Sequence, residues 1–117
     1  MSEDLKNQRK YPRVPVRIQV KIGLSSGESV QATIVDLSPI GAGIEYAAPA
    51  EKGAILKLAF QLRIKEGVQE CHVQARVVHN YLKRNTYVIG VQFLSISEEA
   101  QAILRGYLSH LQSLRVS

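Results

Sequence analysis

The chain has 117 residues, of which 45% are hydrophobic and 21% charged, and its net charge is +5. This size and composition are typical of one soluble globular domain. The sequence has no apolar run of membrane-spanning length and opens on an acidic stretch, so we expect neither a membrane span nor a signal peptide. Its single cysteine, Cys71, cannot form an intrachain disulfide, which agrees with a reducing cytoplasm.

Positive charge is concentrated near the N-terminus. Residues 1–22 contain six Lys or Arg and two acidic residues, a net charge of +4, whereas the rest of the chain contributes only +1. A basic segment of this kind attracts an anion such as a nucleotide, a nucleic acid or an anionic membrane surface.

Three short strands are predicted in the first half of the chain. Residues 16–22 alternate strictly between apolar and polar side chains, which is the pattern of a half-buried strand. Residues 30–35 are expected to form the second strand and residues 42–46 the third. The segment between them, residues 36–41, combines acidic, hydroxyl, proline and glycine residues, which predicts a turn.

Three more strands and one helix are predicted in the second half. The strands cover residues 56–64, 72–79 and 87–93, and turns separate them. The period then changes, because apolar residues recur at intervals of three and four from residue 100 onward. This spacing predicts an amphipathic helix over about residues 96–114, with Ser95 or Ser97 as its N-cap.

Together these elements predict an all-β fold with a terminal helix. The expected architecture is a six-stranded antiparallel β-barrel with the C-terminal α-helix packed against it. Residues 1–12 are expected to form a flexible, basic N-terminal arm and residues 13–117 a single domain. Side chains fill the interior of a small barrel, so a ligand should bind on the outer wall.

The basic arm carries the first of two motifs. Arg9 and Arg13 stand four positions apart on a segment that Pro12 keeps out of a helix. Guanidinium groups bind phosphate oxygens with two parallel hydrogen bonds. The motif therefore suits a phosphate-bearing ligand.

The predicted turn over residues 36–41 carries the second motif. The Asp36 carboxylate can accept hydrogen bonds from N–H donors such as those on a guanine edge, and the Ser38 hydroxyl can donate to phosphate. Gly41 allows a close approach of the backbone. The two motifs together suit a ligand that carries phosphates and a base.

With these motifs and this strand pattern, the chain resembles the PilZ domain family. That family is marked by an arginine-x-x-x-arginine motif, a following Asp/Asn-x-Ser-x-x-Gly motif, and a six-stranded barrel with a C-terminal helix. Arg9 and Arg13 match the first motif, and the second is matched by Asp36, Ser38 and Gly41. The similarity extends from about residue 8 to the C-terminus.

The resemblance implies binding of the bacterial second messenger cyclic di-GMP. Arg9 and Arg13 would then grip the phosphates and stack on or bond to a guanine. Asp36 would accept from the guanine edge, Ser38 would bond a phosphate or the base, and Gly41 would give the turn room.

Other residues are possible additional ligand contacts. Some family members carry a further arginine just before the first motif, where this chain has Gln8, which leaves the number of bound ligands open. Gln8 and Lys10 flank Arg9, and Arg76 or Arg84 on the barrel could supply the additional cation.

The predicted function is a cytoplasmic sensor or adaptor that binds cyclic di-GMP, orders its N-terminal arm and signals to a partner protein. The alternative is a PilZ-like interaction module that docks onto a protein without binding nucleotide. Nucleic-acid binding is disfavoured, because few aromatic residues are available for stacking and the charge outside the arm is small.

An enzyme is not expected. The sequence presents no nucleophile–base pair, metal-ligand cluster or Walker-type loop, so no catalytic residue, metal site or cofactor is predicted. The histidines are scattered, and His72 and His79 are expected to lie on strand faces rather than to act in catalysis.

Overall fold

The structure is a computed structural model that describes residues 12–116, with side chains described through residue 114. Most of the predicted N-terminal arm, including Gln8, Arg9 and Lys10, therefore lies outside the described residues. The elements in chain order are β1 (Val14–Gly23), β2 (Ser29–Ser38), β3 (Gly41–Tyr46), β4 (Ile55–Ile64), β5 (Gly67–Lys83), β6 (Thr86–Ser95) and α2 (Glu98–Val116).

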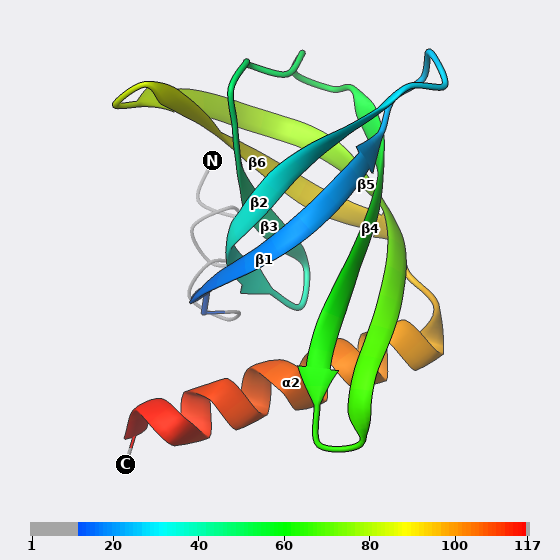
Figure 1. Cartoon of the computed structure of the whole chain (residues 1–117), viewed down its shortest axis with the longest axis vertical. Helices are drawn as coiled ribbons and strands as arrows, with labels where there is room; N and C mark the ends of the chain where they lie inside the picture. The colour runs from blue at the N-terminus through cyan, green and yellow to red at the C-terminus, as the bar shows by residue number, and fades with distance from the viewer. Residues whose placement is uncertain (1–11, 117) are drawn as a thin grey trace.

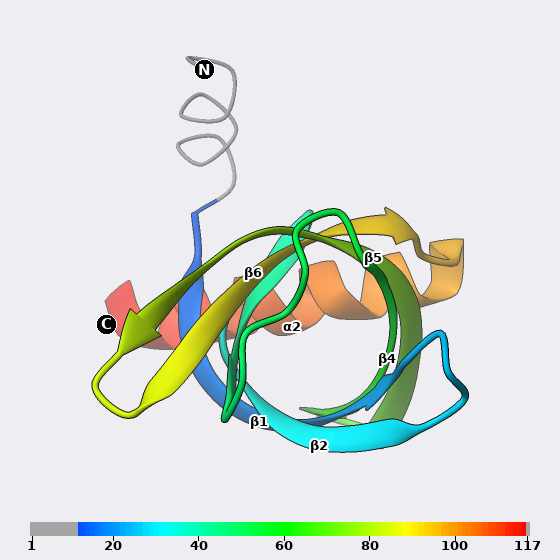
Figure 2. The ribbon, with the colours of Figure 1, turned by 90° about the horizontal axis from the view of Figure 1, so that it is seen from above.

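The six strands form a closed barrel in the order β1-β2-β3-β6-β5-β4, and every neighbouring pair is antiparallel. Figure 1 shows α2 lying across one end of the barrel, and Figure 2 shows the strands as a ring. The prediction of an antiparallel six-stranded barrel with a C-terminal helix is confirmed.

The second and fifth strands are longer than the sequence pattern predicts. β2 continues to Ser38, which pairs with Gly41 of β3, so Asp36 and Ser38 belong to the strand and only residues 39–40 form the turn. β5 extends well beyond the predicted residues 72–79, because it pairs with β4 on one side and with β6 on the other. Where a strand ends depends on its pairing with neighbouring strands, and the alternation of side chains along one strand carries no information about that pairing.

Alternating side chains fill the barrel interior, as the sequence predicts. On β4, Leu56, Leu58, Phe60 and Leu62 are all at most 5% exposed, and the residues between them face outward. Each such side chain contributes about 1.5–3 kcal/mol to stability by leaving water. The interior is therefore a packed core, and binding chemistry is confined to the outer wall.

The C-terminal helix closes one end of this core. Its start is capped by Ser97, whose hydroxyl accepts a hydrogen bond from the Ala100 N–H at 3.1 Å. Leu104 and Leu108 are buried, and the helix packs against β1, β4 and β5. The apolar stripe stops short of Leu114, which is 59% exposed. Within residues 12–116, no helix is long and apolar enough to cross a membrane.

Candidate functional site

On the outer wall of the barrel, one residue of the first motif contacts one residue of the second. Arg13 directly precedes β1, and Asp36 lies on β2 opposite Pro15. The Arg13 Nε lies 3.2 Å from the Asp36 Oδ1, with the two side chains 36% and 27% exposed. The pairing of β1 with β2 thus joins two charged groups that are far apart in the sequence.

Both partners of this ion pair retain unused hydrogen-bonding capacity. The Asp36 Oδ1 is buried, and its contact with Arg13 lacks the alignment of a hydrogen bond, so it accepts none from the described residues. Within the same part of the chain, the terminal guanidinium nitrogens of Arg13 have no partner. A ligand with N–H donors and anionic oxygens would complement both groups.

Ser38 is the last residue of β2 and stabilises the turn that connects β2 to β3. It is 3% exposed, and its hydroxyl accepts from the Ile40 N–H at 3.3 Å and donates to the Gly41 carbonyl at 3.4 Å. These bonds hold the two-residue connection. A ligand contact by Ser38 remains a prediction, and its structural role in the turn is what the contacts establish.

Gly41 is required by the close approach of β6. A Cβ at this position would overlap the carbonyl oxygen of Val91. The Phe93 N–H also donates to the Ile40 carbonyl at 2.8 Å, which fixes β6 against the turn. The glycine of the second motif therefore serves the packing of two backbones.

A second glycine, Gly43, lies beneath the Asp36 carboxylate. Its neighbours Ala42 and Ile44 point into the core, so Gly43 faces the outer wall. A Cβ there would overlap the Asp36 carboxylate, which therefore leans from β2 over β3. The missing side chain of Gly43 gives Asp36 its position.

The same arrangement recurs on the next pair of strands. Gly90 of β6 is the register partner of Gly43, and the His79 imidazole of β5 covers it as Asp36 covers Gly43. His79 is exposed, and its ring centroid lies 6.3 Å from that of Tyr81. A row of four residues thus crosses the wall, with a carboxylate at one end, two glycines in the middle and an imidazole at the other.

The two barrel arginines proposed as additional contacts lie in different places. Arg76 is exposed on β5 opposite Gln92, which in turn faces Gly41, so Arg76 shares the wall with the glycine pair. Arg84 lies in the tip of the β5–β6 hairpin with a φ of 59°. Its position five residues beyond His79 places it about 17 Å farther along the hairpin.

Sequence reasoning missed His79 and Gly90 as members of this row. Gly90 is a visible signal, since it interrupts a run of β-forming residues. The sequence does not reveal that Gly90 pairs with Gly43, because that register belongs to strands far apart in the chain.

Cys71 lies apart from this site. Its side chain is 1% exposed in the barrel interior. Burial, and to a smaller extent the Glu70 carboxylate, raises the pKa of the thiol. A buried, protonated thiol is unreactive, so the interpretation of Cys71 as a small strand residue agrees with the structure.

The described residues form a small closed antiparallel β-barrel with a C-terminal helix, and its outer wall carries a charged pair beside a row of two glycines. The family model described as PilZ domain matches residues 7–110 of the chain. The chain therefore belongs to the PilZ domain family. A comparison with curated protein sequences gives no significant match.

Several solved structures share the fold. The inhibitor of motility MotI/DgrA from Bacillus subtilis has a TM-score of 0.78 and 19% identity, over 90% of this chain and 51% of that one. The PilZ domain of YcgR from Escherichia coli with c-di-GMP has a TM-score of 0.71 and 19% identity, over 92% and 94% of the two chains. The MrkH–c-di-GMP complex from K. pneumonia has a TM-score of 0.70 and 19% identity, over 88% and 51%. The chain thus spans about half the length of MotI and of MrkH.

The glycine contacts predict a graded effect of alanine substitutions on stability. Gly41→Ala should destabilise the fold by about 1–3 kcal/mol, because its methyl group meets backbone that cannot move away. Gly43→Ala should cost less, because the atoms it meets belong to the Asp36 side chain. The helical Gly106 has open space, and Gly106→Ala should stabilise by up to about 1 kcal/mol. Urea denaturation of the three variants tests this order, and a neutral Gly41→Ala would contradict it.

Proposed function

We propose that this PilZ domain is a non-catalytic receptor module for cyclic di-GMP that acts in the bacterial cytoplasm. The observation that carries the proposal is the Arg13–Asp36 pair, held at 3.2 Å beside two outward-facing glycines. Support also comes from the YcgR and MrkH structures, whose c-di-GMP complexes share this fold.

Each group in the proposed site has a chemical role. The free nitrogens of Arg13 bind a phosphate, and Asp36 accepts hydrogen bonds from the N–H donors of a guanine. Gly43 and Gly90 have no side chains, so the Asp36 carboxylate and the His79 imidazole lie close to the backbone and form the surface that a flat base contacts. The exposed His79 ring at the end of the row provides a surface on which the base stacks.

In this proposal the N-terminal arm transmits the signal. Arg9, which lies outside the described residues, joins Arg13 on the phosphates and draws the arm onto the barrel. A segment that becomes ordered on ligand binding changes the surface presented to a partner protein.

One observation favours the alternative, a docking module that binds no nucleotide. Asp36 and Ser38 both have structural partners within the chain, Asp36 in its ion pair and Ser38 in its hydrogen bonds across the turn. A motif that only stabilises the barrel would show the same contacts. The titration described next separates the two functions.

Cyclic di-GMP should bind the purified protein in preference to linear pGpG and GTP, because the cyclic ligand presents its two phosphates and its bases in one compact shape. Isothermal titration calorimetry measures the affinity and the number of ligands together. The absence of heat, with no NMR shifts at high micromolar ligand, would leave the docking module as the better account.

Alanine substitutions in the first motif should weaken binding without unfolding the barrel. Arg9→Ala and Arg13→Ala should each cost about 1.5–3 kcal/mol of binding free energy, the size of a hydrogen bond to a charged group. Arg105→Ala removes an exposed arginine from α2 and serves as the matched control. If Arg13→Ala instead abolished the folded NMR spectrum, its role would be structural.

Asp36 and His79 should differ in what they recognise. Asp36→Ala should narrow the affinity ratio of cyclic di-GMP to cyclic di-AMP, because adenine lacks the guanine N1–H and two-amino donors. Asp36→Asn should do less harm, since its amide oxygen still accepts. His79→Ala removes a stacking surface that serves both bases, so it should weaken both ligands and leave the ratio unchanged. If Asp36→Ala left the affinity for cyclic di-GMP and its ratio to that for cyclic di-AMP unchanged, Asp36 would not recognise the base.

A further inference from the structure

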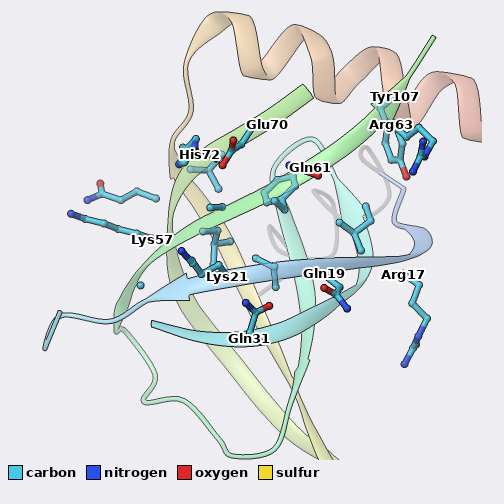
Figure 3. A pocket seen from close by; sticks show the side chains of 18 of the residues that line it. Arg17, Gln19, Lys21, Gln31, Lys57, Gln61, Arg63, Glu70, His72 and Tyr107 are labelled. Carbon is cyan, nitrogen blue, oxygen red and sulfur yellow. Dashed lines mark ion pairs between the residues drawn. The ribbon is translucent and has the colours of Figure 1, made fainter. Parts of the chain in front are cut away.

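A second feature lies on the wall opposite the glycine row. In the ring order β1-β2-β3-β6-β5-β4, the β1–β4 seam is farthest from the β3–β6 seam. A groove of about 1080 Å³ opens along β1 and β4 and extends to Tyr107 of α2. Figure 3 places Arg63 beside Tyr107 at one end of this groove and Lys21 and Lys57 at the other.

The groove forms where two strands part. β1 pairs with β4 only from Val20 to Gly23, opposite Phe60 to Lys57. β4 continues to Ile64 while paired with β5 on its other side. Among the described residues, the β1-facing edge of residues 61–64 therefore has no strand partner. An unpaired edge of this kind is a template for a further extended chain.

The rim of the groove is cationic. Arg17, Lys21, Lys57 and Arg63 line it, against the single carboxylate of Glu70. Glu70 is held by His72 at 3.2 Å, and Arg17 lies 3.3 Å from Glu45 with its side chain 73% exposed. Within the described part of the chain, the other three cations have no acidic partner. The electrostatics therefore select an acidic occupant.

The floor of the groove favours a peptide over a nucleic acid. It contains the apolar side chains of Ile18, Ala59 and Phe60, with Gln19 and Gln61 between the cations. Phe60 is only 3% exposed and cannot offer its ring to a base, which leaves Tyr107 and His72 as the accessible rings of the lining, whereas single-stranded nucleic acid stacks successive bases on a series of aromatic side chains. An extended peptide alternates its side chains and could direct apolar ones to the floor and acidic ones to the rim.

We propose that this groove binds an acidic, extended segment of a partner protein, which adds as a strand to the β4 edge at residues 61–64. Carboxylates of the segment pair with Arg63 at one end and with Lys21 and Lys57 at the other. The proposal rests on the adaptor part of the proposed function and is independent of nucleotide binding, because the two sites lie on opposite walls.

A synthetic peptide of alternating glutamate and valine is the probe, titrated into the isotope-labelled full chain. Backbone amide shifts should centre on residues 61–64 and on the facing residues of β1. Arg63→Glu should weaken the affinity about tenfold, since an attraction becomes a repulsion. Lys52→Glu, an exposed position outside the groove, is the matched control and should change it little. A backbone N-methylated peptide should lose binding, because it cannot donate the strand hydrogen bonds.

Several results would overturn the proposal. These are the absence of shifts at the β4 edge, equal binding of a lysine–valine peptide, and undiminished binding of the N-methylated peptide. Stronger binding of oligodeoxythymidine would identify a nucleic-acid groove instead. Displacement of the probe by a peptide of residues 1–11 would mean that the chain covers its own groove. The titration is repeated with Arg13→Ala, which should bind the peptide normally even though its affinity for cyclic di-GMP is reduced. Failure of the peptide site is thereby distinguished from failure of the nucleotide site.

Discussion

Closure of the strand ring brings β3 and β6 together at a point where neither strand has a side chain on the outer wall. Gly43 and Gly90 are register partners there, and the room above them is occupied from the two sides by Asp36 and His79. Larger residues at either glycine would push these groups off the wall. The positions of the carboxylate and the imidazole therefore depend on the absence of two side chains.

The Arg13–Asp36 pair adds little to the stability of the barrel. Both side chains are about one-third exposed, and ion pairs of this exposure contribute roughly 0–1 kcal/mol. A weak pair can exchange partners at small cost when a ligand arrives, while the buried core keeps its geometry. The barrel core therefore fixes the position of the site, while the charged pair at its surface can rearrange.

The barrel separates two kinds of surface. The wall of β2, β3, β6 and β5 carries the paired charges and the glycine row. The wall of β1 and β4 carries the cationic groove and, among the described residues, a strand edge with no strand partner at residues 61–64. The interior between them is filled by core side chains, which keep the two surfaces apart. Such an arrangement suits an adaptor that responds to one molecule and contacts another.

Much of this protein could be predicted from its sequence. Alternation on residues 16–22 and 56–64 identified strands with one buried face, and the change of period after residue 96 identified the helix and its Ser97 cap. These features follow from side-chain periods of two and about 3.6, which are local properties of the chain. The two motifs were also visible, because their residues are neighbours in sequence.

The tertiary structure alone decided which distant residues meet. Strand register set the contact of Arg13 with Asp36 and the row from Asp36 to His79. It also placed Ser38 at the end of β2, where its hydroxyl bridges the turn, and Gly41 against the backbone of β6. It also ended the pairing of β1 with β4 at Val20, which opens the groove. Register between strands far apart in the chain depends on the joint packing of all six, and no local pattern of residues contains that information.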